Sequence, residues 1–177
     1  MLSTTALAQQ PRAPSLPAPP PMRLVSRAEH SELAAASNPK SRLRATINFA
    51  EQHLSRAEML TDQKKFDEAS VELGDYLGLI GDLRDFLMSL NADKGSTRDL
   101  FRHMEIAIRA HVPRLAIMRR TTPSEYAIHI KDAEDYIKDT RSAALDSFYG
   151  HSVLRDEPAE KTPAAEPQSQ SRGLKRP

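Results

Sequence analysis

Apolar residues recur at alternating intervals of three and four along most of the middle of the chain. Between Asn38 and about Thr61 they fall on one stripe of a helix, made by Leu43, Ile47, Ala50, Leu54 and Ala57. Asn38 is a good N-cap residue and Pro39 suits the first helical position, so the helix is expected to begin there. A longer stripe follows the polar turn TDQKK and runs from Phe66 to Leu90. This second helix is the predicted centre of the core.

Two further segments carry the same spacing. A third helix is predicted from about Thr97, and Pro113 should kink it about one turn earlier because proline removes a backbone donor. A fourth is predicted from the capping box Thr122-Pro123-Ser124-Glu125 to Gly150. The inner faces are expected to consist of Leu100, Met104, Ile108, His111, Leu115 and Met118 in the third helix, and of Tyr126, Ile130, Ala133, Ile137, Ala144 and Phe148 in the fourth.

Four helices with one apolar stripe each can bury these stripes only against one another. The sequence therefore predicts an all-α fold, an antiparallel helical bundle of about four helices with disordered N- and C-terminal tails. An irregular array of helical hairpins is the alternative. Gly74, Gly78 and Gly81 interrupt the second helix at spacings of four and three, and we expect them to let another backbone approach closely.

The two ends of the chain have a different composition from the middle. Residues 1–37 are predicted to hold a signal-peptide remnant, a proline-rich extended linker outside any core, and a short, loosely docked helix near residues 23–37. The bundle is assigned to residues 38–154 and a disordered tail to residues 155–177. A chain cut to the bundle is therefore expected to keep the thermal stability of the whole.

The first residues suggest export. Ala6-Leu7-Ala8 has the small-x-small form cut by a signal peptidase, and Gln9 would begin a polar mature end. The charged start and apolar run that should precede the triplet are missing, so either the triplet is chance or the true start lies upstream of Met1. The prediction is an extracytoplasmic protein, periplasmic or secreted, with the cytoplasm as the alternative.

Composition and charge narrow the function. The 177 residues include 25 basic and 24 acidic side chains and no cysteine, which excludes disulfides and thiolate metal sites and argues against a nucleic-acid partner. No apolar run reaches the roughly 18 residues of a membrane helix. Six arginines could bind phosphate, but neighbouring acids balance them: Arg98, Arg102, Arg109, Arg114, Arg119 and Arg120.

No motif for catalysis, metal or cofactor is present, so no enzyme activity, metal or cofactor is predicted. The six histidines lack the HExxH motif and the i, i+4 pairing that zinc sites use. His111 lies on an inner face, where it is either a hydrogen-bonded core residue or part of a buried site shared with Tyr126 or Tyr136. His103 is offset around the helix, and His129 with Asp132 is more typical of a solvated face.

The stretch AEQHLSRAEMLTDQKKFDEASVELGDYL resembles one tetratricopeptide unit, in which two antiparallel helices pack through small residues. Ala57, Phe66, Ala69 and Leu73 match the pattern, whereas Tyr76 stands where a small residue is usual and Gly81 where a proline is usual. No second copy follows about 34 residues later. The layout also resembles small exported bacterial helical proteins of unknown function.

By elimination, the sequence favours a non-enzymatic helical interaction or structural module whose partner is a protein. The alternative is a ligand-binding or enzymatic bundle with a site around His111.

Overall fold

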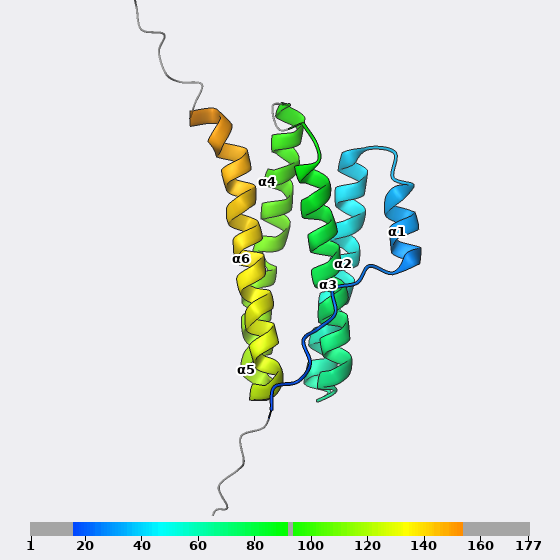
Figure 1. Cartoon of the computed structure of the whole chain (residues 1–177), viewed down its shortest axis with the longest axis vertical. Helices are drawn as coiled ribbons and strands as arrows, with labels where there is room; N and C mark the ends of the chain where they lie inside the picture. Colours follow the sequence, from blue (N-terminus) through cyan, green and yellow to red (C-terminus); the bar gives the residue numbers. More distant parts are fainter. Residues whose placement is uncertain (1–15, 92–93, 154–177) are drawn as a thin grey trace, which may run out of the picture.

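The computed structural model describes residues 16–91 and 94–153, with side chains up to residue 149. These residues form six α-helices and no strand (Figure 1), namely α1 (Arg27–Ala34), α2 (Pro39–Asp62), α3 (Phe66–Met88), α4 (Gly95–Arg109), α5 (His111–Thr121) and α6 (Ser124–Val153). The predicted all-α class is confirmed. The signal-peptide remnant and the tail at 155–177 lie outside the described residues.

Five of the six helices pack in two groups, and α1 lies beside the first group. α2 and α3 form a hairpin, and α4 and α5 follow one another along α6 (Figure 1). The expected number of about four helices is therefore corrected to six in the described part of the chain. One reason is that the predicted third helix is broken at Ala110, because Pro113 has no N–H to donate to the carbonyl of Arg109. The other is that α1 is a separate helix.

Capping explains where the helices begin. The Asn38 side chain accepts a hydrogen bond from the Ser41 N–H at 2.9 Å, so α2 begins as predicted. The capping box predicted at Thr122 is not used in that way, since the Thr122 hydroxyl donates to the Met118 carbonyl at 2.7 Å and closes the end of α5. α6 starts at Ser124 and continues past the predicted end at Gly150.

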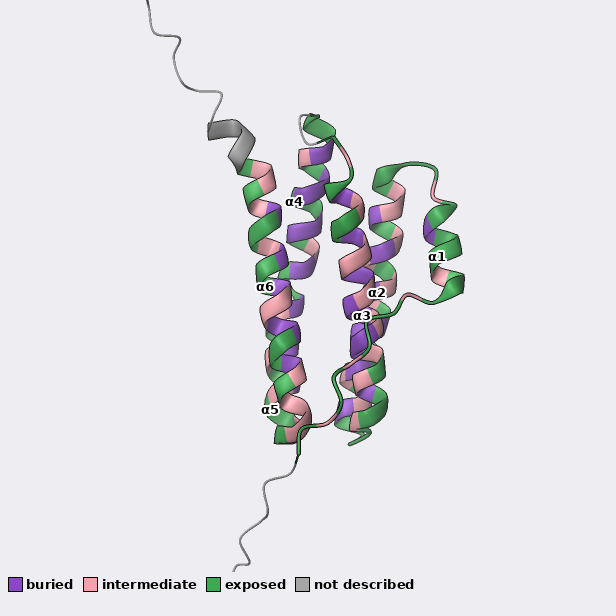
Figure 2. Ribbon diagram, in the orientation of Figure 1, coloured by how far each residue is buried: buried purple, intermediate pink, exposed green. Residues whose placement is uncertain are grey.

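The predicted apolar stripes point inward (Figure 2). In α2 the stripe is buried except for Ile47, which is half-buried. Burying a leucine or isoleucine contributes about 1.5 to 3 kcal/mol each, so the core dominates stability. The fully buried large apolar side chains include Leu54, Leu73, Leu79, Ile80, Leu83, Leu87, Met104, Ile108, Leu115 and Ile137.

The turn between α2 and α3 contains the one non-glycine residue with positive φ in the described chain, Lys64 at 64°. The Lys65 N–H donates to the Leu60 carbonyl at 2.9 Å, and the Lys64 N–H donates to the Thr61 carbonyl at 3.0 Å. This pair of bonds is a Schellman motif, in which glycine usually occupies the left-handed position. The turn is therefore made at some backbone strain.

The proline-rich segment is extended, as expected, but it lies against the bundle rather than apart from it. Residues 16–25 run from the start of α6 along α3 towards α1 (Figure 1). Gly74 faces the backbone of Met22, and Gly78 faces the backbone of Leu24. The close approach expected is thus confirmed at these two glycines, where the approaching backbone is the N-terminal segment, but not at Gly81, where a Cβ would meet only the Tyr136 side chain.

α1 is docked through specific contacts. Ser26 caps it with a complete capping box to Glu29, and Leu33 is only 1% exposed. The expectation of loose docking is therefore wrong. The polar contacts of Glu29, described below, add to this docking.

Candidate functional site

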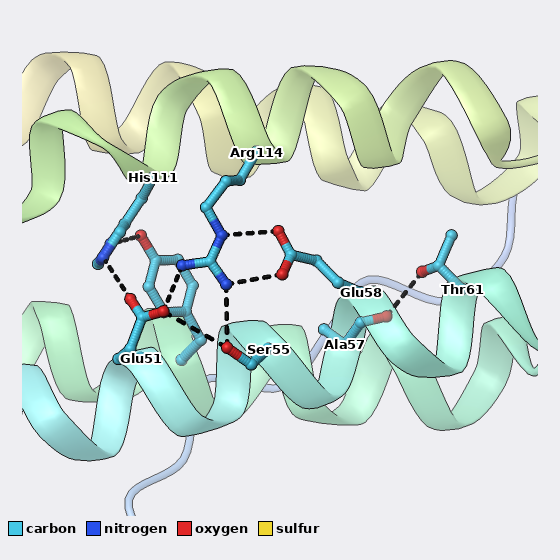
Figure 3. Close-up of polar contacts among 8 residues, drawn as sticks. Glu51, Ser55, Ala57, Glu58, Thr61, His111 and Arg114 are labelled. Carbon is cyan, nitrogen blue, oxygen red and sulfur yellow. Dashed lines mark hydrogen bonds and ion pairs between the residues drawn. The ribbon is translucent and has the colours of Figure 1, made fainter.

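A polar cluster joins α5 to the α2–α3 hairpin around His111 (Figure 3). His111 is the first residue of α5 and is 2% exposed. Its Nδ1 lies 3.1 Å from the hydroxyl of Tyr76 on α3, and its Nε2 lies 3.1 Å from Oε2 of Glu51 on α2. Three helices thus contribute one polar group each.

The environment fixes the protonation of this cluster. Burial lowers the pKa of His111 and outweighs the opposing attraction of Glu51, so the imidazole is neutral at physiological pH. Burial raises the pKa of Tyr76, which keeps its proton. We assign the tautomer from the partners: the Tyr76 hydroxyl donates to Nδ1, and Nε2–H donates to the Glu51 carboxylate.

Arg114 extends the cluster along α2 by one turn of α5 (Figure 3). Its guanidinium binds Glu58 in a bidentate manner, with Nε at 2.7 Å and Nη2 at 2.6 Å from the two carboxylate oxygens. It also donates to Glu51 and, at 3.0 Å, to the Ser55 hydroxyl. Burial alone would raise the pKa of Glu51, but Arg114 and His111 outweigh it and lower that pKa. The Glu51 carboxylate therefore accepts hydrogen bonds from both Arg114 and His111.

The chemistry open to His111 is limited by these partners. Both ring nitrogens are engaged, and a substrate would have to displace Glu51 or Tyr76 to reach them. An imidazole bonded in this way acts as a clamp between helices. The arrangement can position α5 on the hairpin, and it leaves no free nitrogen for general acid–base catalysis.

A second histidine cluster holds α1 on the hairpin. His53 of α2 places Nδ1 2.6 Å from Oε2 of Glu72 on α3, and Nε2 2.8 Å from Oε1 of Glu29 on α1. Asp75 lies 4.0 Å from Nδ1. Burial alone would lower the pKa of His53, but the hydrogen bonds to Glu29 and Glu72 outweigh it and raise the pKa. His53 therefore favours the imidazolium form, with an N–H for each carboxylate.

Sequence reasoning missed both histidine partnerships. The predicted neighbours of His111, Tyr126 and Tyr136, lie elsewhere: the Tyr126 hydroxyl donates to Asp67 at 2.6 Å, and Tyr136 lies under the Arg23 guanidinium. The partner is Tyr76. The available signal was its place on the longest apolar stripe, because a buried hydroxyl requires a hydrogen-bond partner.

The other two candidate histidines form hydrogen bonds with backbone carbonyl groups. His103 Nδ1 lies 2.6 Å from the carbonyl of Asp99 on its own helix. His129 Nε2 lies 2.6 Å from the carbonyl of Ala18 in the N-terminal segment. Neither lies in the His111 cluster. Within the described ranges, no group of three or more histidine, aspartate or glutamate residues is arranged to hold a metal ion.

Three of the six arginines singled out in the sequence, Arg109, Arg114 and Arg119, are paired with acids. Arg109 and Arg141 both bind Glu105, which is 2% exposed. Arg119 binds Glu134 at 3.2 Å. The side-chain bonds to Arg109, against the effect of burial, lower the pKa of Glu105. These pairs fasten α4 and α5 to α6.

Comparisons with family models, with curated proteins and with solved structures found no match to this chain. The resemblance to a tetratricopeptide unit stays a prediction. In the part of the chain that the structure describes, no helix combines the length and the apolar character needed to cross a membrane.

Proposed function

We propose that this chain is a non-enzymatic helical interaction module of an exported bacterial protein, and that its partner is a protein. The observation that supports this function is the extended segment at residues 16–25, which lies on α3 and the start of α6. It makes this contact largely through its backbone. A surface that holds its own extended chain in this way is suited to holding another polypeptide.

The surroundings of this segment support the same function. Val71 on α3 is 63% exposed, and it lines one groove together with Met22 and Leu24 of the segment itself, which are 69% and 52% exposed. Exposed apolar side chains gathered at one groove are typical of protein contact sites. A nucleic-acid partner has less support, because Arg109 and Arg114 are neutralised by glutamates.

The alternative is a ligand-binding or enzymatic bundle with its site around His111. The buried titratable cluster of His111, Tyr76 and Glu51 supports it. Because both nitrogens of His111 are engaged, we favour the interaction module.

Photocross-linking in the native host tests the interaction function. A photoreactive amino acid at Val71 should give a discrete adduct with one protein, identified by mass spectrometry. The matched control is the same residue at Lys40, which is exposed at the start of α2. Equal adduct patterns at the two positions would contradict the proposal. Loss of biological activity in His111→Leu with normal cross-linking would favour the alternative.

Export is tested separately. The small residues Ala6 and Ala8 support cleavage before Gln9, in a part of the chain outside the described residues. Mass spectrometry of the native protein should give a mature N-terminus at Gln9. A cytoplasmic protein with an intact Met1 would overturn export and favour the cytoplasm.

A further inference from the structure

The floor of the groove under the N-terminal segment consists of two glycines. A Cβ atom at Gly74 would collide with the Met22 carbonyl oxygen, and a Cβ at Gly78 would collide with that of Leu24. Each glycine costs about 1 kcal/mol of helix propensity in the interior of α3. At Gly81, three residues on, a Cβ would lie 3.3 Å from the Tyr136 hydroxyl, the end of a flexible side chain, and would meet no backbone of the segment. Gly74 and Gly78 therefore make room for the backbone of the extended segment on α3.

The start of α6 binds the segment at Ala18 through backbone atoms of the segment. The Ala18 N–H donates to the Glu125 carbonyl at 3.0 Å, and His129 Nε2 lies 2.6 Å from the Ala18 carbonyl. These two bonds fix the register through the backbone. Any residue except proline at this position can make them, because proline lacks the N–H.

Aromatic and acidic side chains supply a preference for composition. Tyr126 lines the groove beside Pro19, Pro20 and Pro21, and aromatic walls suit the preformed extended conformation of prolines. The Arg23 guanidinium lies 4.2 Å from the centre of the Tyr136 ring. The segment forms one wall of a hollow whose opposite wall includes Asp67 and Asp75, so the surface beside the bound chain is acidic. The groove thus suits a proline-rich segment followed by a basic residue.

The present occupant is held weakly. None of residues 16–25 is fully buried, and Leu16 and Met22 are mostly exposed. A segment with few buried contacts opens at low free-energy cost. Covalent attachment offsets this weak binding, because a short tether raises the effective concentration of the segment to about the millimolar range.

We propose that the groove of α3 and α6 is a recognition site for an extended proline-rich segment of a partner protein, and that residues 17–24 occupy it as a tethered, displaceable competitor. The inference rests on the proposed interaction function and names its site and the chemistry of its partner. Displacement of residues 17–24 leaves the bundle intact, because none of them belongs to the apolar core, whereas Val25 packs against the core and stays in place.

The test uses full-length chains. In a vacated variant, residues 17–24 are replaced by a Gly-Ser repeat of equal length, with Val25 retained because it packs against the core, and circular dichroism checks that the helices are retained. A synthetic peptide LPAPPPMRLV is then titrated into the labelled protein and followed by NMR. Saturable shifts should centre on Gly74, Gly78 and His129. Apparent affinity for the native chain should be about tenfold weaker, because the tethered segment competes.

Glycine variants provide matched controls within α3. In the vacated chain, Gly74→Ala with Gly78→Ala should abolish peptide binding while raising thermal stability, because alanine favours helix. Gly81→Ala should raise stability without affecting binding. A Gly-Ser peptide of equal length, which lacks the prolines and the arginine, should not bind.

Three outcomes would overturn the inference. The first is failure of the peptide to bind the vacated, folded chain at millimolar concentration. The second is unchanged binding in the double alanine variant. The third is concentration-dependent dimerisation of the native chain that the peptide reverses, since this would make a second copy the occupant. A cross-link from Val71 that persists when the peptide fails to bind would leave the proposed function standing.

Discussion

Raising the pH from 6 to 9 should release α1 from the bundle while the remaining helices stay folded. At pH 6 the imidazolium of His53 donates one N–H to Glu29 and the other to Glu72. A neutral imidazole has a single N–H, so after deprotonation one carboxylate faces a ring lone pair. The side chains involved are largely buried, with His53 10% and Glu29 14% exposed, so water replaces the lost bond poorly.

The direction and size follow from these contacts. Because the folded pKa of His53 is raised, its contribution to docking is complete below the ordinary pKa of 6.5 and is lost as the pH rises through the folded pKa. The contribution of Glu29 has the opposite pH dependence. Its hydrogen bonds lower its pKa against the effect of burial, so this contribution is present above the ordinary pKa of 4.5 and is lost on acidification. Asp75, whose pKa is raised by burial, and Arg56, 4.0 Å from Glu72, face the same cluster. Losing one charge-assisted hydrogen bond costs about 2 kcal/mol, or roughly a thirtyfold increase in the open population of α1.

The assay combines two NMR measurements. Imidazole resonances give the pKa of His53, and amide hydrogen exchange in α1, corrected for the intrinsic effect of pH, gives its opening free energy. Glu72→Gln should remove most of the pH dependence. His30→Gln, at an exposed histidine on α1 itself, is the matched control and should leave it intact. A His53 pKa below 6.5, or constant protection of α1 from pH 6 to 9, would refute the reasoning.

Other substitutions test the remaining polar contacts by chemical or thermal unfolding. His111→Leu should destabilise the protein by about 1 to 3 kcal/mol because it leaves the buried Tyr76 hydroxyl without an acceptor, and adding Tyr76→Phe should recover part of the loss; a neutral single variant would contradict this. Lys64→Gly should stabilise by about 0.5 to 1 kcal/mol by relieving the positive φ, and a destabilised variant would show that the turn is not strained. Glu105→Ala should cost about 1 to 2 kcal/mol, chiefly because Arg141 loses its buried carboxylate partner, whereas Arg109 is 60% exposed and water replaces its bond; a change below about 0.5 kcal/mol would contradict this. A chain beginning at Asn38 lacks α1 and its buried Leu33, so its free energy of unfolding should fall by about 2 kcal/mol, or roughly 5 °C in Tm. The sequence alone predicted no loss, and an unchanged midpoint would support that prediction.

The sequence predicted what depends on neighbouring residues. The stripe from Leu43 to Ala57 and the cap at Asn38 follow from helical periodicity and backbone chemistry, and the structure confirms both. The kink predicted one turn before Pro113 is at the right place but is a full break at Ala110. These features are local, so a single sequence contains their cause.

Pairings between distant polar residues were beyond the same reasoning. His111 meets Tyr76 across 35 positions, and His53 meets Glu29 across 24. Periodicity places each residue on a face but does not say which face it meets. The docking of the proline-rich segment was missed for a related reason: composition predicted its extended conformation, whereas its docking depends on two glycines about 50 positions away in the sequence. The candidate site was therefore only half predictable, with His111 identified and its partner missed.

The bond between Ala18 and His129 also sets an order of events during synthesis. The two residues are 111 positions apart, so at about 5 to 20 residues per second the ribosome needs about 5 to 20 seconds to make the second after the first. Until then the N-terminal segment has no wall of α6 to dock against. The first part of the described chain to be translated is thus among the last to reach its final place, and it stays open to cellular factors while the bundle is being built.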